Sequence, residues 1–220
     1  MLINGIVAMD KNKGIGINNQ LPWKLKDDLQ RFQKFTIGKG NNAIIMGKNT
    51  WNSIKTLKNR DHLILSSSMN LEYINNENIV KSFINIDSLL KFTEEKKYDE
   101  LWVIGGSQIY KQFLELNLIN NFYVTMIDDE YTCDTYLSSF PDNYFIAQTN
   151  LLKEKNSLGK NTHMIVFKKI EKNMKVIYND TLWNVENIHY DDYPNCYFTI
   201  KNTEGREIQT VNSKLKIYKS

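Results

Sequence analysis

The residue with the clearest chemical potential is Asp28, an acid that interrupts an apolar stripe. A helix over residues 25–35 places one set of side chains on a single face: Leu25, Asp28, Leu29, Phe32 and Phe35. Taken alone, Asp28 is most simply explained as a first-turn acid that complements the helix dipole. The alternative is a carboxylate aimed into an apolar cleft. Desolvation would raise its pKa there, and it would accept hydrogen bonds from the amino-nitrogen edge of a ligand.

Two strand–glycine–helix junctions have the composition of phosphate-binding sites. The first joins a predicted strand at 43–46 to Gly47, Lys48 and a polar helix, and the second joins a strand at 101–104 to Gly105 and Gly106. Glycine lets a phosphate approach backbone N–H groups, and a helix N-terminus favours anions. Each junction alone is unspecific. Neither has the G-x-G-x-x-G pattern, so a standard Rossmann domain is not predicted.

Hydroxyl groups and a loop complete the candidate site. Ser66, Ser67 and Ser68 follow a predicted strand, and with Lys48 they form a suitable pocket for the 2′-phosphate that distinguishes NADPH from NADH. Ordinary turn chemistry explains the serines equally simply when they are taken alone. The segment 16–23 combines turn-forming residues with proline and tryptophan, which is typical of a mobile loop that closes over a site.

Alternating strands and helices must position these residues. The predicted strands are Leu2–Met9, Ala43–Met46, His62–Leu65, Ile79–Lys81 and Leu101–Ile104, and the predicted helices are Leu25–Phe35, Asn49–Ile54, Ile86–Glu95 and Ser107–Leu116. This alternation predicts an α/β domain with a mixed, mostly parallel central sheet flanked by helices. After residue 117 the predicted strands are Phe122–Ile127, Tyr144–Thr149 and Thr162–Ile170, with no helix between them. We expect them to add to the sheet edge in antiparallel fashion.

A second, small all-β unit is predicted at 171–220, after a domain at 1–170. Its candidate strands are Lys175–Tyr178, Leu182–His189, Cys196–Lys201, Glu207–Val211 and Lys214–Tyr218, with a hairpin turn at 203–206. Its size and pattern suggest an SH3-like barrel. Its aromatic residues form either the core of the unit or a recognition surface: Trp183, Tyr190, Tyr193, Tyr197 and Phe198. We hypothesise that the unit docks a protein partner or a second copy of the chain.

Composition excludes several classes of function. The net charge is +3 with the lysines scattered, and the charges of the small unit cancel, so no nucleic-acid partner is expected. No run of apolar residues is long enough for a membrane helix, and the N-terminal run is too short for a signal peptide. Two distant cysteines favour free thiols and a cytoplasmic location. The three histidines, His62, His163 and His189, do not have the spacing of metal ligands, so no metal is expected.

Taken in order, the motifs resemble the dihydrofolate reductase family over residues 1 to 170. They are Gly14-Ile15-Gly16-Ile17, Leu21-Pro22-Trp23 with Asp28-Leu29 and Phe32, Ile45-Met46-Gly47-Lys48-Asn49-Thr50-Trp51 with Ser53-Ile54, Leu65-Ser66-Ser67, Val103-Ile104-Gly105-Gly106-Ser107 with Ile109-Tyr110, and Asp134-Thr135. Each is unspecific alone, but their combination in this order is very specific. The resemblance implies reduction of dihydrofolate to tetrahydrofolate with NADPH, by hydride transfer to C6 and protonation of N5.

The resemblance also implies the substrate-side residues. Asp28, Trp23 and Thr125 match the catalytic set, in which Asp28 holds the pterin N3 and 2-amino edge with support from Thr125. Arg60 matches the arginine that clamps the α-carboxylate of the glutamate tail, a bidentate contact that suits a guanidinium. The remaining substrate contacts are implied for Ala8, Leu29, Phe32, Ile54, Leu57, Ile104 and Tyr110. Antifolates with a diaminopyrimidine ring are implied ligands of Asp28.

On the cofactor side, the resemblance implies contacts from both glycine junctions. Ala8 and Ile15 match nicotinamide contacts, and Lys81 is expected near the adenine. Phosphate contacts are implied for Gly47, Lys48, Asn49, Thr50, Gly105, Gly106, Ser107, Gln108 and Ile109, and the 2′-phosphate pocket for Ser66, Ser67 and Lys48. The family has a cis bond between the two glycines, so we expect one at Gly105–Gly106.

Three departures from the family and two rival functions stand beside this interpretation. The segment 38–42 looks slightly expanded, Lys48 stands where arginine is common, and Tyr136 stands where many bacterial members have histidine. One rival is a reductase of riboflavin or pterin biosynthesis, which would not need the combination of Asp28, Thr125 and Arg60. The other is a folate- or nucleotide-binding protein that has lost catalysis and acts through its C-terminal unit.

Overall fold

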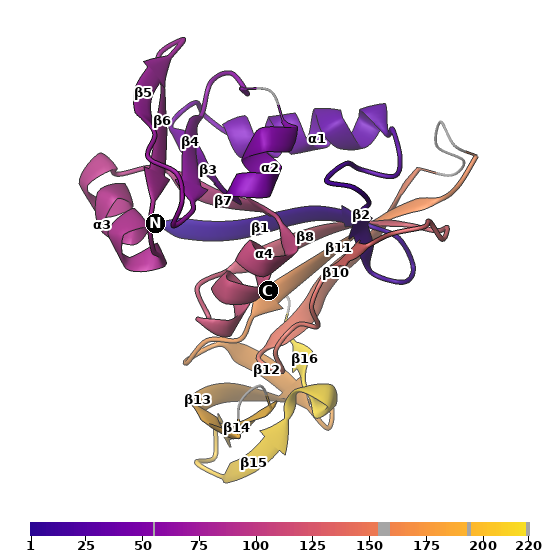
Figure 1. The fold of residues 1–220 in the computed structure, drawn as a ribbon. Helices are drawn as coiled ribbons and strands as arrows, with labels where there is room; N and C mark the ends of the chain where they lie inside the picture. Colours follow the sequence, from indigo (N-terminus) through magenta and orange to yellow (C-terminus); the bar gives the residue numbers. More distant parts are fainter. Residues whose placement is uncertain (55, 154–158, 193–194, 219–220) are drawn as a thin grey trace.

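The computed structural model describes residues 1–54, 56–153, 159–192 and 195–218. A nine-stranded sheet has the order β10-β11-β8-β1-β7-β3-β4-β6-β5, so β1 lies in its interior (Figure 1). The strands are β1 Leu2–Met9, β3 Asn42–Gly47, β4 Asp61–Leu65, β5 Glu72–Asn75, β6 Asn78–Phe83, β7 Glu100–Gly105, β8 Asn121–Ile127, β10 Tyr144–Lys153 and β11 Thr162–Lys169. The helices are α1 Lys26–Ile37, α2 Lys48–Ser53, α3 Ile86–Lys96 and α4 Ser107–Glu115.

Helices cover both faces of this sheet, which explains why the central strands are continuous apolar runs. On one face, Ile44, Ile64 and Trp102 form a cluster against which Phe32 and Phe35 of α1 pack. On the other face, a second cluster joins the alternate strand residues to α3 and α4: Ile45, Leu63, Val103, Leu89, Ile109, Tyr110, Phe113 and Leu114. The predicted α/β class with a mixed, mostly parallel sheet is therefore confirmed.

The edges of the sheet differ from the prediction in two respects. β8 pairs parallel with β1, and only β11 and β10 continue in antiparallel fashion, so the prediction for β8 was wrong. At the opposite edge lies β5, which pairs antiparallel with β6 and was not predicted. A two-stranded sheet of β2 Gly14–Gly16 and β9 Thr135–Tyr136 was also not predicted.

The C-terminal residues form a separate five-stranded antiparallel sheet, with the order β15-β14-β13-β12-β16. Its strands are β12 Lys175–Tyr178, β13 Thr181–Asp192, β14 Asn195–Asn202, β15 Glu207–Val211 and β16 Lys216–Ile217, with a 3-10 turn at Asn212–Lys214. The last predicted strand was too long, because its first residue belongs to this turn. Trp183 and Phe198 are buried core residues, Tyr190 is exposed, and Tyr193 lies outside the described residues.

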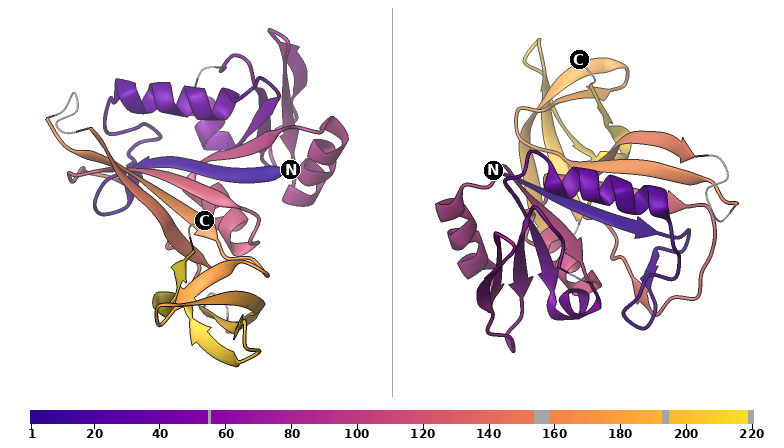
Figure 2. Two further views of the ribbon diagram at one scale, coloured as in Figure 1. Left: turned by 180° about the vertical axis from the view of Figure 1, so that it is seen from behind. Right: turned by 90° about the horizontal axis from the view of Figure 1, so that it is seen from above.

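This sheet packs against β10 and β11 at one end of the molecule (Figures 1 and 2). Phe145 and Ile170 join the apolar core of the small sheet, so the two units share one cluster: Phe145, Ile170, Val176, Trp183, Val185, Cys196, Phe198 and Ile200.

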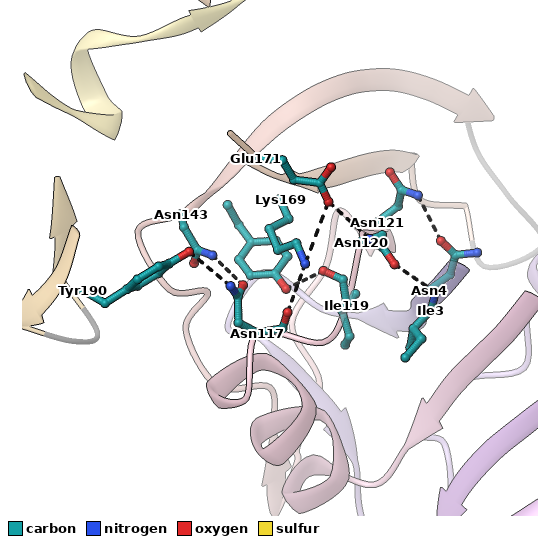
Figure 3. A network of polar contacts seen from close by, with 11 residues as sticks. Ile3, Asn4, Asn117, Ile119, Asn120, Asn121, Asn143, Lys169, Glu171 and Tyr190 are labelled. Atoms are coloured by element: carbon teal, nitrogen blue, oxygen red, sulfur yellow. Dashed lines mark hydrogen bonds and ion pairs between the residues drawn. The ribbon is translucent and has the colours of Figure 1, made fainter. Parts of the chain in front are cut away.

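Polar contacts reinforce this junction (Figure 3). Asn117 Nδ2 donates to the Tyr190 hydroxyl at 3.1 Å, and Asn143 Nδ2 donates to Asn117 Oδ1 at 2.6 Å. Lys169 Nζ donates to the Asn117 carbonyl at 3.0 Å, and Asn212 Nδ2 donates to the Tyr144 carbonyl at 2.7 Å. The two sheets are therefore joined by directional bonds as well as by apolar packing.

Candidate active site

One cleft of about 1240 Å³ brings together nearly all the predicted site residues. Its lining includes both glycine junctions, the loop before α1 and one face of α1. From the substrate set it contains Ala8, Trp23, Asp28, Leu29, Phe32, Ile54, Leu57, Arg60, Ile104 and Tyr110, and from the cofactor set Ile15, Gly47, Lys48, Asn49, Thr50, Ser66, Ser67, Gly105, Gly106, Ser107, Gln108 and Ile109. Parallel strands point their carboxyl ends to the same edge, which explains why distant segments meet here.

Asp28 lies in the first turn of α1 with its side chain 18% exposed. Arg31 Nη1 donates to Asp28 Oδ1 at 3.0 Å and to Thr125 Oγ1 at 3.1 Å. Burial raises the pKa of the Asp28 carboxyl, while Thr125 and Arg31 oppose that rise. Asp28 is therefore a carboxylate in an apolar cleft, although its position in the first turn also suits the helix dipole.

Thr125 is buried and is not part of the cleft lining. It lies behind Asp28, where its hydroxyl bonds to the carboxylate and lowers the pKa of Asp28. This is the supporting position that the family resemblance implies. The contact of Arg31 with both Asp28 and Thr125 was not predicted.

Arg60 is buried, with only 4% of its surface exposed, whereas its charge alone would have suggested the protein surface. Its Nη1 donates to Thr36 Oγ1 and to the Gln33 carbonyl, and its guanidinium lies 5.6 Å from the centre of the Phe32 ring. Its Nε has no hydrogen-bond partner within the described part of the chain. Burial lowers the pKa of Arg60 to about 10, so the side chain remains a cation at neutral pH. A fixed cation in the cleft wall is suited to binding a carboxylate.

The second glycine junction is held closely against β1 and α2. The Tyr110 hydroxyl donates to the Ile6 carbonyl at 2.7 Å, and a Cβ on Gly105 would lie 3.3 Å from the Tyr110 ring. A Cβ on Gly106 would lie 3.4 Å from Thr50 Oγ1, so a side chain there would fill the space between the two junctions. The Gly105–Gly106 bond is cis, as expected. α4 begins directly after this pair, and its first N–H groups are directed toward the cleft end of β7.

A cation and three hydroxyls meet at the neighbouring strand end. Lys48 Nζ donates to Ser68 Oγ at 3.0 Å, and Ser68 N donates to Ser66 Oγ at 3.2 Å. Ser67 is exposed and lines the cleft. The donor set fits a phosphate group, so the residues of this half of the cleft fit a phosphorylated dinucleotide such as NADPH.

Lys81 does not lie where it was predicted. It is not part of the cleft lining; its Nζ is paired with Glu72 Oε1 at 2.6 Å and lies 5.1 Å from the centre of the Phe92 ring. Lys81 is on β6, and its pairing with the unpredicted strand β5 directs the side chain to that edge of the sheet. The proposed contact with the adenine is therefore not supported.

The loop before α1 is anchored at two carboxylates. Asp10 is fully buried and accepts hydrogen bonds from the backbone N–H groups of Asn12, Gly14 and Tyr131, at 2.9, 2.7 and 2.9 Å. Asp134 Oδ2 accepts from Asn18 N at 2.7 Å. The role of Asp10 was missed, because a lone acid after a strand carries no distinctive pattern.

Trp23 closes the base of this loop. It is buried, it lines the cleft, and its ring meets Tyr131 edge-on at 5.2 Å. Its indole Nε1 has no hydrogen-bond partner within the described part of the chain. This donor is available to a ligand or a water in the cleft.

Within the described residues, no group of three or more histidines, cysteines or acids is arranged to hold a metal ion. No helix in the same ranges is both long and apolar enough to cross a membrane.

Comparison with known proteins agrees with this geometry. A family model described as dihydrofolate reductase matches residues 2–172. The chain is 36% identical to the dihydrofolate reductase of Buchnera aphidicola subsp. Baizongia pistaciae (strain Bp) over 177 residues, which cover 78% of the chain and 99% of that relative. It is 35% identical over 150 residues to the dihydrofolate reductase of Gallus gallus, which covers 64% and 78% of the two chains.

A longer relative is matched only in part. The chain is 34% identical over 157 residues to the bifunctional dihydrofolate reductase-thymidylate synthase of Paramecium tetraurelia, and the match covers 70% of the chain but 32% of the relative. The family match ends at residue 172 and so leaves out the C-terminal sheet. With one cleft that joins a partly buried carboxylate to two phosphate-binding junctions, the chain belongs to the dihydrofolate reductase family, whose members are oxidoreductases that reduce dihydrofolate to tetrahydrofolate with NADPH.

Proposed function

We propose that this cleft catalyses the NADPH-dependent reduction of 7,8-dihydrofolate to 5,6,7,8-tetrahydrofolate, with Asp28 as the catalytic carboxylate. The observation that carries the proposal is the continuity of the cleft. Asp28 lies in its apolar half, and Gly105, Gly106 and Lys48 lie in its polar half. A flat heterocycle and a dinucleotide that bind in these two halves would meet between them.

In the substrate half, Asp28 accepts hydrogen bonds from N3 and the 2-amino group of the pterin. Thr125 holds the carboxylate from behind. Arg60 binds the α-carboxylate of the glutamate tail, and its fixed position supports this role because little side-chain entropy is lost on binding. The apolar walls around the ring are Ala8, Leu29, Phe32, Ile54, Leu57, Ile104 and Tyr110.

In the cofactor half, the N–H groups at the start of α4 and the glycine pair bind the pyrophosphate. Lys48 and the serines at 66–68 hold the 2′-phosphate, with Lys48 as a point charge where a planar guanidinium would give bidentate contacts. When bound, NADPH supplies the hydride for C6 of the pterin.

Proton transfer to N5 depends on Asp28 and on exclusion of bulk water. Asp28 binds the far edge of the ring, so it raises the basicity of N5 and promotes protonation through an ordered water. The indole N–H of Trp23, which no acceptor among the described residues occupies, is a suitable donor to such a water. Closure of residues 14–24 excludes bulk solvent and strengthens these interactions.

The direct test is turnover of purified protein with dihydrofolate and NADPH, followed by the loss of NADPH absorbance. The same assay with NADH and with methotrexate measures cofactor preference and antifolate sensitivity. Rapid oxidation of NADPH that methotrexate blocks is the expected result. Binding of NADPH and methotrexate without turnover would favour a silenced folate binder. Binding of NADPH alone would favour a reductase of another heterocycle.

Asp28→Asn tests the assigned role. We expect the rate of reduction at neutral pH to fall by about 10²- to 10⁴-fold, because the variant can no longer promote protonation of N5. The rate should recover partly in acid, where solvent protonates N5. Asp27→Asn is the matched control, since Asp27 is an exposed neighbour on the same helix turn. Full activity of Asp28→Asn at neutral pH would refute the assignment.

We also propose a cytoplasmic location for the protein. Support comes from Cys133 and Cys196, which are both free thiols. Fractionation of cells that express a tagged chain would test this, and recovery in a membrane or exported fraction would contradict it.

For the C-terminal unit we propose contact with another protein chain, either a partner or a second copy. Support comes from apolar side chains that it exposes, Leu182 at 38% and Val211 at 43%. Leu182→Asp and Val211→Asp are better probes than deletion, because deletion would uncover Phe145 and Ile170. The expected result is a smaller mass in solution or loss of a bound partner. An unchanged assembly in both variants would count against the proposal.

A further inference from the structure

Arg31 lies behind the substrate pocket. Unlike most arginines, it is largely shielded from solvent and its guanidinium bonds to other side chains. Its side chain is 19% exposed. One nitrogen, Nη1, donates both to Asp28 Oδ1 and to Thr125 Oγ1. Arg31 therefore bridges the catalytic carboxylate on α1 and the threonine on β8, two groups that are 97 residues apart in sequence (125 − 28).

We infer that Arg31 is a positioning residue for Asp28 that makes the pocket prefer a neutral heterocycle over a protonated one. The inference rests on the proposed function of Asp28. It concerns which of two kinds of ligand binds this pocket more tightly. The assigned reaction does not decide this.

The preference follows from electrostatics. A dihydropterin binds through the N–H groups of its amino edge and carries no net charge on the ring. A 2,4-diaminopyrimidine is a stronger base, and beside a carboxylate it takes a proton and binds as a cation. A guanidinium 3.0 Å from Asp28 Oδ1 already neutralises much of the carboxylate's charge and repels a second cation. The guanidinium repels the neutral ring much less, because that ring carries no net charge.

The same bonds also hold the carboxylate in place, and they do so for a neutral and for a protonated ring alike, since both rings present two donors to it. Because Nη1 bonds to Oδ1, this oxygen enters complex formation with one lone pair already used. A ligand edge that needs both oxygens must share Oδ1 with Arg31, or Arg31 must move. Thr125 restrains that movement, since it accepts from the same nitrogen.

Other groups around Asp28 do not supply this charge. Tyr110 on α4 interacts with the charge of Asp28, but burial raises the pKa of its phenol so far that it remains neutral. Thr125 on β8 does not titrate. Asp27, the adjacent residue of α1, is exposed. The opposing influence of Arg31 on the pKa of Asp28 agrees with its position.

The test compares Arg31→Met, which removes the charge, with Arg31→Lys, which keeps it. Dissociation constants are measured for trimethoprim, a diaminopyrimidine without a glutamate tail, and for dihydrofolate. We expect Arg31→Met to improve the affinity for trimethoprim relative to dihydrofolate by about tenfold. Arg31→Lys should stay close to the wild-type ratio. Lys34→Met removes a charge from the last turn of the same helix and should also leave the ratio unchanged.

A second readout separates charge from structure. The pH profile of single-turnover hydride transfer should shift upward in Arg31→Met, because the pKa of Asp28 rises when the cation is removed. A merely structural role would change rates without moving this profile. Arg31→Gln, neutral but able to hydrogen-bond, serves if the methionine variant does not fold, as judged by circular dichroism.

The outcomes are distinct from those for the proposed function. Failure of the wild type to reduce dihydrofolate would overturn the function, while the trimethoprim comparison would still report on the charge of Arg31. If the wild type is active but Arg31→Met changes neither the affinity ratio nor the pH profile, the inference is overturned and the proposed function stands. A variant that loses affinity for both ligands equally would also overturn it.

Discussion

His62 is a fully buried residue of β4 that fixes the segment carrying Leu57 and Arg60. Its Nε2 accepts a hydrogen bond from Leu57 N at 3.0 Å, and its ring meets Trp51 edge-on at 5.6 Å. An accepting Nε2 requires the neutral ring, with its proton on Nδ1. Burial, reinforced by the charge of Arg60 and opposed by Asp61, lowers the pKa of His62 to about 4. The site therefore depends on a histidine that is kept neutral.

This residue predicts a pH-dependent loss of stability. The pKa of a histidine is about 6.5 in the unfolded chain, so below that pH the unfolded state binds a proton that the folded state does not bind until about pH 4. As the pH falls between these two values, the free energy of unfolding should decrease by at most about 3 kcal/mol in total. Below about pH 4 the contribution of His62 no longer changes. Urea unfolding from pH 7 to pH 4 measures it.

The control for this prediction is His62→Gln, which keeps an acceptor for Leu57 N but does not titrate. The variant should show a shallower decline than the wild type. Parallel curves for the two proteins would mean that other groups cause the decline.

At the scale of elements, the loop between β1 and α1 is held by a strand that lies more than a hundred residues away in sequence. β2 pairs with β9, Asp134 N donates to the Gly16 carbonyl at 3.0 Å, and Asp134 Oδ2 accepts from Asn18 N. The backbone of Asn18 is left-handed, with φ of 50°, so this bond stabilises a conformation that few residues adopt readily.

Asp134→Ala should therefore loosen the loop without unfolding the protein. We expect the rate of hydride transfer to fall by about tenfold, because loss of one charge-assisted hydrogen bond costs about 1.5–3 kcal/mol and part of this is recovered by water. Stopped-flow single turnovers measure the rate. Asp128→Ala, which removes a surface ion pair with Lys11, should have no such effect. Equal rates in the wild type and Asp134→Ala would show that the bond does not control closure.

The elements that could be predicted from sequence are those with strong apolar patterns. Strands β1, β12 and β15 were predicted with the observed ends, because each alternation or apolar run is bounded by polar residues. β5 was missed because three of its four residues are exposed, so its sequence has no buried face. β2 was missed because three residues, two of them glycine, have low strand propensity and depend on β9 for pairing.

The candidate site shows the same division. The glycine junctions and Asp28 were predictable because their spacing is local, and the family resemblance supplied Thr125 and Arg60. Arg31 was missed because an arginine three residues after an aspartate is ordinary on a helix surface. Only the fold brings Thr125 to it. Lys81 was misplaced because the partner that holds it, Glu72, belongs to the unpredicted edge strand.

For the whole molecule, the shared cluster around Phe145 and Ile170 joins the C-terminal sheet to the body of the enzyme. The bond from Asn117 to Tyr190 (Figure 3) and the bond from Asn212 to Tyr144 cross the same junction. A unit that lacks its neighbour would expose apolar surface. The two parts are therefore expected to unfold together.

Hydrogen exchange provides the test of this cooperativity. With NADPH and methotrexate each at about a hundredfold above its dissociation constant, global unfolding should be opposed by about 2.7 kcal/mol per ligand, or about 5 kcal/mol together. Hydrogen exchange of the β14 amides in the C-terminal sheet should then slow as much as exchange of the β3 amides beside the cleft. Slowing confined to β3 would show that the C-terminal sheet opens independently.

The interior position of β1 also has a consequence for synthesis. Its lateral partners, β7 and β8, begin at residues 100 and 121. At about 5–20 residues per second, roughly 5–20 seconds pass between translation of β1 and translation of β7. Throughout that interval a strand with Ile3, Ile6 and Val7 has no neighbour to cover it on the ribosome. We therefore expect that slower elongation, which lengthens this interval, lowers the yield of soluble enzyme.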